Sequence, residues 1–309
     1  MDSVLIKVFA FVTIIVAGYL AGHFGKIGRG TSNTLSKIVF NFTLPCAVIN
    51  AFGKAEFTHD MLWLIVVGVA CTVGSYFIML PFVRKSERLD KIFYLCNISG
   101  YNIGCFALPF VQAFFPPAQA AAICLFDSGN AFMMSGGTYA LTSVLVPGKE
   151  GPVEHPGRLI VRRMFSSVTI DAYLTLIVLA IFDIRIPQPI VDFTQPMANA
   201  NAFLAMFMLG LMTHLSVDAS KLGKVVRLLS LRFTLNVAFT LVALFVLPFS
   251  PIVKLILCMG IWAPAGAMGP VFTMWCKGDY GLAGFANTIT VAVSIVALTC
   301  IALMAGVAA

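Results

Sequence analysis

The chain has 309 residues, of which 60% are hydrophobic, 20 are Lys or Arg and 13 are Asp or Glu. A soluble domain carries about 25% charged residues, whereas this chain carries 11% and has a mean hydropathy of +0.96. These values exclude a disordered chain, a collagen, a soluble enzyme and a nucleic-acid-binding protein. The apolar stretches are long and continuous, which favours membrane-spanning helices over the short alternating strands of a β-barrel.

Apolar stretches long enough to cross a bilayer recur along the whole chain, and most connections between them are short. We expect ten membrane-spanning helices, at residues 4–24, 32–52, 60–83, 92–115, 119–146, 164–184, 190–215, 225–248, 251–275 and 280–307. The first stretch has no basic segment before it, so we expect a retained helix and not a signal peptide. The fold class is therefore an all-α polytopic membrane protein.

A polar stretch at 148–163, PGKEGPVEHPGRLIVR, divides the ten helices into five and five. We expect a first five-helix repeat at 1–147, a cytoplasmic linker at 148–163 and a second five-helix repeat at 164–309. Five is an odd number, so the second set must enter the membrane in the opposite sense, which is the topology of an inverted repeat. The second helix of each half carries a proline, Pro45 and Pro196, and the fourth carries glycine and proline breakers.

The basic residues predict the orientation, because Lys and Arg concentrate in cytoplasmic loops. With the N-terminus outside, only Lys7, Lys54, Arg185 and Lys254 fall on the non-cytoplasmic side. The cytoplasmic set is Lys26, Arg29, Lys37, Arg84, Lys85, Arg88, Lys91, Lys149, Arg158, Arg162, Arg163, Lys221, Lys224, Arg227, Arg232 and Lys277. We therefore expect a multi-pass protein of the inner or plasma membrane with both termini non-cytoplasmic. The charge of +7 needs no nucleic-acid partner.

The fourth helix of each half contains several helix breakers in a short stretch. Residues 99–110 read SGYNIGCFALPF and residues 262–270 read WAPAGAMGP. Such clusters unwind a helix, and unwound backbone at membrane depth is tolerated only where protein buries it or a wet cavity receives it. Interrupted helices at matching positions of two halves indicate a transporter's binding site. The alternative is two kinked helices that pack closely at glycine and bind nothing.

The chemistry of such a site follows from the ends of the half-helices. A helix that starts near the membrane midplane presents free N–H groups and roughly half a positive charge, which attract a carboxylate. Neither broken stretch contains a basic residue, and Asn102 adds an amide. The pattern therefore favours a secondary transporter of a small organic anion, a mono- or dicarboxylate, over an enzyme.

Several motifs resemble those of the auxin efflux carrier family along nearly the whole chain. Asn102 is followed seven residues later by Pro109, and residues 264–266 read Pro-Ala-Gly, as at the two crossover helices of that family. Residues 205–211, AMFMLGL, are similar to its seventh helix, and residues 40–47, FNFTLPCA, to its second. The short central loop resembles a bacterial permease more than a plant auxin exporter.

The resemblance implies a crossover fold shared with sodium–bile acid symporters, with broken, crossing helices 4 and 9. It further implies a scaffold of helices 1, 2, 6 and 7, a transport domain of helices 3–5 and 8–10, elevator-type alternating access and a homodimer in the lipid bilayer. The residues expected at the substrate are Asn102, Gly104, Pro109, Pro264, Ala265, Gly266, Cys46, Asn199 and Asn201. For Asn199 and Asn201 interhelical packing is the alternative, and Cys46 can equally be a small packing residue.

Polar residues follow each broken stretch and are candidates for coupling transport to an ion. Asp127 lies in an apolar stretch, where an ionisable residue is costly and usually functional. With Ser128 and Asn130 it could coordinate Na⁺ or carry a proton, or it could form a structural hydrogen bond. Asn287, Thr288 and Thr290 occupy the matching place in the last helix, with threonine bonding to its own helix as the alternative.

Other functions stay open from the sequence alone. The alternatives are an uncoupled uniporter or exporter of an auxin-like acid, and a sensor or channel on the same fold. The eight Cys have no paired ligand spacing and are expected to be free thiols, and the four His do not form a metal site. We expect no cofactor other than Na⁺ or H⁺ as a coupling ion.

Overall fold

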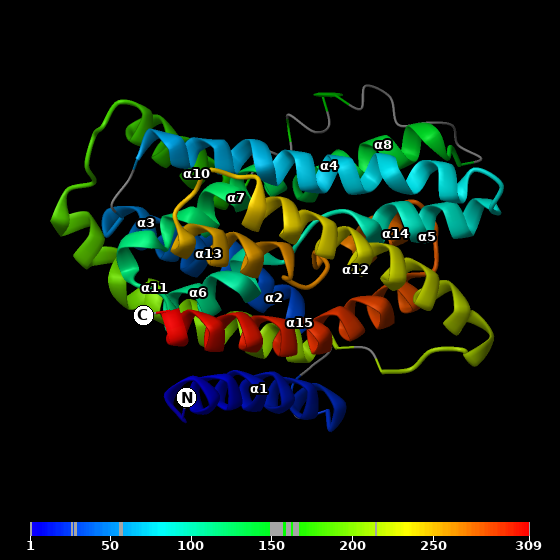
Figure 1. Ribbon diagram of the computed structural model, residues 1–309. Helices are drawn as coiled ribbons and strands as arrows, with labels where there is room; N and C mark the ends of the chain where they lie inside the picture. Colours follow the sequence, from blue (N-terminus) through cyan, green and yellow to red (C-terminus); the bar gives the residue numbers. More distant parts are fainter. Residues whose placement is uncertain are drawn as a thin grey trace.

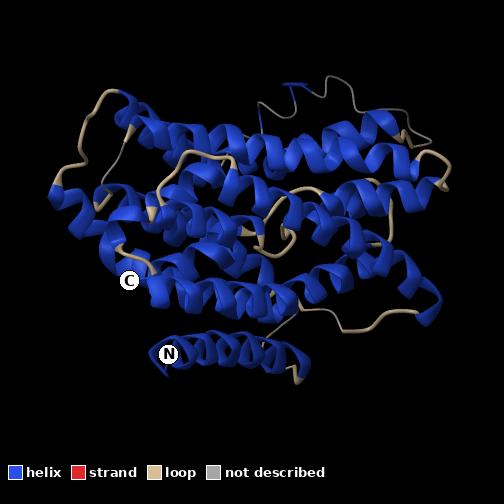
Figure 2. Cartoon of the chain, in the orientation of Figure 1, coloured by secondary structure: helices blue, strands red, loops and turns tan. Residues whose placement is uncertain are grey.

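The computed structural model describes residues 2–25, 27, 30–55, 58–148, 157, 158, 162, 167–213 and 215–308. Four residues of the basic cytoplasmic set, Lys26, Arg29, Lys149 and Arg163, lie outside the described residues, as does most of the 148–163 linker. His155 and His214 lie outside them too. Every regular element in the described residues is a helix (Figure 2).

The first half is built from helices joined by tight turns and by short π-helical or 3-10 segments, which carry the label η. In chain order they are α1 (Asp2–His23), α2 (Thr31–Ile38), η1 (Val39–Thr43), α3 (Leu44–Gly53), η2 (His59–Leu62), α4 (Trp63–Val83), α5 (Arg88–Ile98), η3 (Ile103–Ala107), α6 (Leu108–Phe114), η4 (Pro117–Gln119), α7 (Ala121–Phe132), η5 (Met133–Gly137) and α8 (Thr138–Leu145).

In the described residues, the second half contains α-helices of 8 to 29 residues and a 3-10 segment. They are α10 (Val168–Ile181), α11 (Gln188–Leu211), η6 (Ala219–Lys221), α12 (Leu222–Phe245), α13 (Pro251–Ile261), α14 (Met268–Trp275) and α15 (Tyr280–Ala308). Each of the ten ranges expected from the sequence contains helix. The two prolines of the second helices do not interrupt them: Pro45 lies in the first turn of α3, and α11 continues through Pro196.

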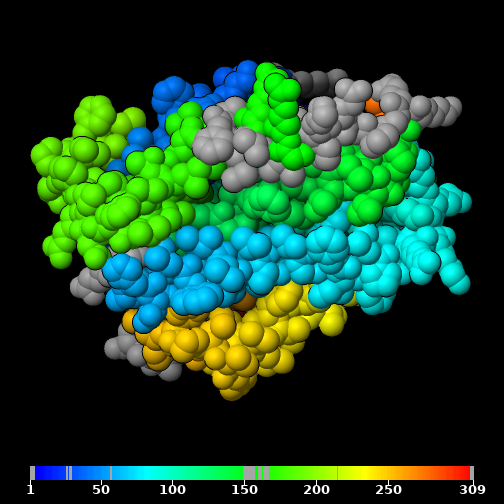
Figure 3. Space-filling model, turned by 90° about the horizontal axis from the view of Figure 1, so that it is seen from above, coloured from blue at the N-terminus to red at the C-terminus, as the bar shows by residue number. Residues whose placement is uncertain are grey.

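Among the described residues, five helical stretches are long and apolar enough to cross a membrane on their own. They are Val4–His23, Thr31–Gly53, His59–Val83, Ala219–Phe245 and Tyr280–Gly306. Large apolar side chains such as Phe9, Phe193 and Phe245 point outward from the helices and are largely exposed. Figure 3 shows α4, in light blue, crossing one face between green segments and the yellow α12, and its outward side chains include Phe77 and Phe82. Contiguous apolar surface of this kind is suited to hydrocarbon, so the chain is a multi-pass membrane protein.

Glycines set the closest helix contacts. A Cβ on Gly18 of α1 would lie 2.2 Å from the Phe207 carbonyl oxygen of α11, and one on Gly129 of α7 would lie 2.1 Å from the Ile65 carbonyl oxygen of α4. Small residues allow this approach in a membrane, where packing and not hydrophobic exclusion drives helix association.

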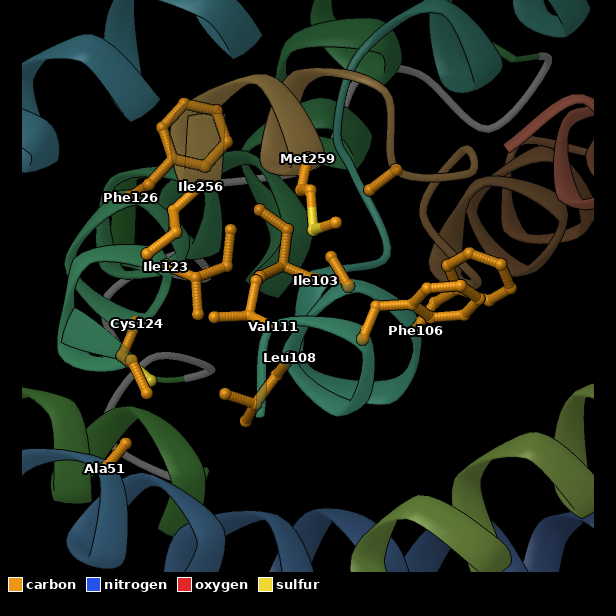
Figure 4. Close-up of a cluster of buried hydrophobic side chains, with 14 of the residues drawn as sticks. Ala51, Ile103, Phe106, Leu108, Val111, Ile123, Cys124, Phe126, Ile256 and Met259 are labelled. Carbon is orange, nitrogen blue, oxygen red and sulfur yellow. The ribbon is translucent and has the colours of Figure 1, made fainter. Parts of the chain in front are cut away.

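The buried core surrounds the helix that restarts after the first break. Figure 4 shows Ile103, Phe106 and Val111 packed with Ile123 of α7 and Met259 of α13. In Figure 1, α5 and α14 lie toward one end of the molecule while α6 and α13 lie toward the other. The two interrupted helices, α5–α6 and α13–α14, therefore pass each other in the interior of the molecule.

Candidate functional site

The first break separates α5 from η3 and α6. Helix α5 ends at Ile98, Ser99 is extended with φ −93° and ψ 153°, and helical structure restarts at Ile103. Gly100 has φ +84°, in the left-handed region that favours glycine, and a Cβ there would lie 2.2 Å from the Met134 sulfur. The predicted break therefore occurs at the SGYN sequence, because glycine readily adopts a left-handed conformation that residues with a side chain rarely take.

The second break separates α13 from α14, and it pairs directly with the first. Helix α13 ends at Ile261 and α14 begins at Met268. The Asn102 N–H donates to the Pro264 carbonyl at 2.8 Å, and the Gly266 N–H donates to the Gly100 carbonyl at 3.3 Å. Tyr101 and Ala265 consequently form an isolated antiparallel β-bridge. The unwound backbones satisfy part of each other's hydrogen bonding, as buried peptide groups require.

A polar side chain from the following helix fixes each break. Asn130 of α7 accepts from the Tyr101 N–H at 2.9 Å and donates back to the Tyr101 carbonyl at 2.9 Å. Thr290 of α15 accepts from the Ala265 N–H at 2.9 Å and donates to the Asn287 carbonyl of its own helix at 2.6 Å. The two bridge-forming residues are thus held in the same way, by residues 29 and 25 positions further along the chain.

A cavity of about 290 Å³ lies beside the crossing. The residues that line it come from η1, α3, both breaks, α7, η5 and the start of α10; they are Phe40, Leu44, Tyr101, Asn102, Ile103, Gly104, Cys105, Asp127, Asn130, Ala131, Met134, Ser135, Ser167, Thr169, Ile170, Tyr173, Ala267 and Met268. Its wall is mainly apolar with a few convergent polar groups, as in small-molecule sites. No Lys, Arg or His of the described residues lines it.

Hydrogen-bond donors face this cavity from the start of η3. Asn102 is 6% exposed, and its Nδ2 is buried without a partner among the described residues. The N–H groups of Ile103, Gly104 and Cys105 open a helix, so no carbonyl one turn earlier can accept from them. The same arrangement recurs at the other side of the crossing, where Ala267 and Met268 begin α14. Two helix N-termini therefore converge on one cavity.

Asp127 is the one acidic residue among those lining the cavity, and it is 8% exposed. One carboxylate oxygen accepts from Asn130 Nδ2 at 2.8 Å and the other from the Tyr173 hydroxyl of α10 at 2.6 Å. Asp127 is thus linked through Asn130 to the Tyr101 peptide of the first break. Asn130 is thus the single side chain that connects the Asp127 carboxylate to the backbone of the first break.

Several residues expected at the site lie elsewhere. Asn199 is exposed on α11 and accepts from Gln195 of the same helix at 2.6 Å, because its helix face points away from the crossing. Cys46 packs against Met197, and Pro109 is buried in the first turn of α6; neither lines the cavity. Ser128 donates to the Cys124 carbonyl of its own helix at 2.8 Å.

The remaining predicted residues divide between the cavity and its supports. Gly104 lines the cavity, where a Cβ would lie 2.6 Å from Leu44. Asn201 is fully buried, accepts from Thr43 at 3.0 Å and donates to the Gly104 carbonyl at 3.5 Å, so it joins α11 to the restarted helix. Thr288 donates to the Gly284 carbonyl of its own helix, and Asn287 reaches the break only through Thr290.

Two residues at the site were not predicted to be there. Tyr173, the partner of Asp127, gave no signal in the sequence. Arg232 was assigned to the cytoplasmic end of its helix, and this was wrong: it is 2% exposed and its guanidinium donates to the Ile98 and Gly100 carbonyls, each at 2.8 Å. Its position well inside the apolar helix α12 was the signal, because intramembrane ionisable residues are usually functional.

A helical membrane protein with two broken helices beside a mainly apolar cavity that a few polar groups enter has the organisation of a transporter. The comparison with known families agrees: the model of a family described as membrane transport protein matches residues 3–149. That match covers slightly less than half of the chain, contains the first break and Asp127, and supports the resemblance to the auxin efflux carrier family. No curated protein matches the chain.

Proposed function

We propose that this protein is a secondary transporter that moves a small organic anion, a mono- or dicarboxylate, and holds the carboxylate at the crossing of the two breaks. The observation that carries the proposal is the buried Asn102 Nδ2, which has no partner among the described residues and belongs to the cavity wall. A buried amide that lacks a partner is costly. A carboxylate oxygen is the acceptor it needs, and the free N–H groups of Ile103 and Gly104 supply further donors beside it.

Coupling to H⁺ or Na⁺ follows from the charge of the cavity. Asp127 and a substrate carboxylate would repel each other at close range in a medium of low dielectric constant. A proton on Asp127, or a Na⁺ held by its oxygens and those of neighbouring groups, removes that repulsion. We therefore propose that the coupling ion neutralises Asp127 when the anion enters, and that Asn130 transmits this change to the first break.

We also propose the ten-helix inverted repeat and the elevator motion. The matching breaks and the matching supports Asn130 and Thr290 support two related five-helix halves, at 1–147 and 164–309. If helices 1, 2, 6 and 7 are the scaffold, the Tyr173–Asp127 and Asn201–Gly104 hydrogen bonds lie between it and the transport domain. Both would then break and re-form as the transport domain moves. A homodimer with both termini non-cytoplasmic completes this proposal.

Uptake of labelled malonate, succinate, pyruvate and lactate into proteoliposomes tests the proposal. The wild type should take up at least one of these acids with saturation. Asn102→Ala should reduce that uptake by at least about tenfold, the effect of losing roughly 1.4 kcal/mol of binding. Asn199→Ala is the matched control, because Asn199 is exposed outside the cavity. Equal uptake by the Asn102→Ala and Asn199→Ala variants would remove Asn102 from the site.

The same vesicles distinguish the alternative functions. Uptake should be driven by an inward H⁺ or Na⁺ gradient, and insensitivity to both gradients would identify a uniporter. Saturable exchange of internal for external labelled acid should be seen for a carrier. Linear, unsaturable flux would identify a channel.

A further inference from the structure

Arg232 of α12 occupies the carbonyl end of the first half-helix. Its two terminal nitrogens donate to the Ile98 and Gly100 carbonyls at 2.8 Å each, and the guanidinium carbon lies 4.9 Å from the centre of the Tyr101 ring. Ile98 is the last residue of α5, where a helix presents free carbonyls and a partial negative charge. The guanidinium therefore meets the negative end of α5 and the face of an aromatic ring, both of which favour a cation.

Among the described residues, Arg232 has no acidic partner. No Asp or Glu of the described residues forms an ion pair with it, and its Nε is buried without a hydrogen bond. Carbonyl dipoles and an aromatic face compensate a buried charge only in part. A net positive charge consequently stays inside the molecule beside the first break.

This charge is built into the same stretch of backbone that forms the cavity wall. Arg232 holds the carbonyl of Gly100, which also accepts from the Gly266 N–H of the second break, and its ring partner Tyr101 lines the cavity next to Asn102. The negative charge near the same break is that of Asp127, which accepts from Asn130, and Asn130 also donates to the Tyr101 carbonyl. The crossing thus contains one fixed cation and one acid that are not paired with each other.

We propose that Arg232 determines the anion selectivity of the carrier: its fixed positive charge offsets Asp127 and admits a carboxylate to a cavity that has no basic residue in its wall. This inference rests on the proposed function. Arg232 acts through the field of its charge and through the backbone it holds, and so it is a positioning and selectivity residue that does not touch the substrate.

The test is the KM and the maximal rate for the acid that the wild type transports, measured in Arg232→Gln and Arg232→Lys. The Gln variant should raise KM by about tenfold or more, as expected for loss of a unit charge acting at short range in protein. The Lys variant should raise KM by less than about threefold, because it keeps the charge, although its ammonium cannot contact both carbonyls and the Tyr101 ring as the planar guanidinium does. Arg227→Gln is the matched control, since Arg227 lies on the same helix, donates to a carbonyl and packs on Tyr94 but is exposed.

A merely structural role predicts a different result. Both Arg232 variants would then lower the amount of folded carrier and its maximal rate together, with KM unchanged, and this would overturn the inference. If Arg232→Gln gives no monodisperse protein, Arg232→Lys alone decides: a KM near wild type supports the inference, and a tenfold rise contradicts it. If the wild type transports none of the acids tested, the proposed function and this inference both fail. If Arg232→Gln folds and has the wild-type KM, the inference about Arg232 is wrong and the proposed transport function stands.

Discussion

Replacing Asn130 by Ala should destabilise the protein and stop transport, because one side chain supports the whole first break. The substitution removes three hydrogen bonds, at 2.9, 2.9 and 2.8 Å, to the Tyr101 N–H, the Tyr101 carbonyl and Asp127. Tyr101 is buried, so its two peptide groups are left without partners. At about 1–3 kcal/mol for each of the two unsatisfied groups, the loss in free energy of unfolding is about 2–6 kcal/mol.

The assay is thermal unfolding of the purified protein in detergent, followed by uptake in proteoliposomes. Ser128→Ala is the matched control, because Ser128 lies on the same helix but bonds only to its own backbone. It should change stability by less than about 0.5 kcal/mol. Equal melting temperatures and equal uptake for Asn130→Ala and Ser128→Ala would refute the idea that Asn130 supports the break.

Two further predictions concern helix packing and pH. Gly129→Ala should destabilise by about 1–3 kcal/mol or more, because its Cβ would meet the Ile65 carbonyl at 2.1 Å, whereas Gly74→Ala, with open space around it, should be neutral or slightly stabilising in thermal unfolding. The hydrogen bond from Lys221, at 2.6 Å, lowers the pKa of Asp279 below its usual value. That contribution is present above the unfolded-state pKa and is lost as the pH falls through the lowered one. Asp279→Asn should therefore reduce stability modestly at pH 7 and flatten the acid side of its pH profile. An unchanged profile would show that the pair is too exposed to matter.

The positions of the breaks could be predicted because glycine and proline act locally. Gly100 can adopt its positive φ without the steric cost that a side chain would add, and a cluster of breakers disfavours a continuous helix. The helical ranges could be predicted for a similar reason, since a long apolar stretch in a membrane protein has few alternatives to helix. Asn102 was singled out because it is an amide within the broken stretch and because it matches, with Pro109, a motif of the family that the chain resembles.

The residues that complete the site depended on contacts between distant parts of the chain. Tyr173 meets Asp127 across 46 residues, and Arg232 meets Gly100 across 132. Asn199 and Asn201 are two positions apart on one helix, and only the packing of α11 decides that Asn201 faces the crossing while Asn199 faces outward. Helix rotation is set by tertiary packing, which periodicity cannot reveal in a helix that is apolar on most sides.

Arg232 was misplaced for a different reason. The positive-inside pattern groups basic residues by the nearest helix end, and Arg232, although it lies inside α12, was counted with Lys224 and Arg227 near the start of that helix. The half-helix α5 ends inside the protein, and its carbonyls provide acceptors that a continuous helix would not have offered. The break in one helix therefore explains a buried cation in another.

The most direct test is an experimental structure of the protein with a transported carboxylic acid bound. We expect density for the acid in the cavity beside the crossing, with a carboxylate oxygen within about 3.2 Å of Asn102 Nδ2 or of the Ile103 and Gly104 N–H groups. An acid bound elsewhere, with the Asn102 amide turned away from it, would contradict the central claim.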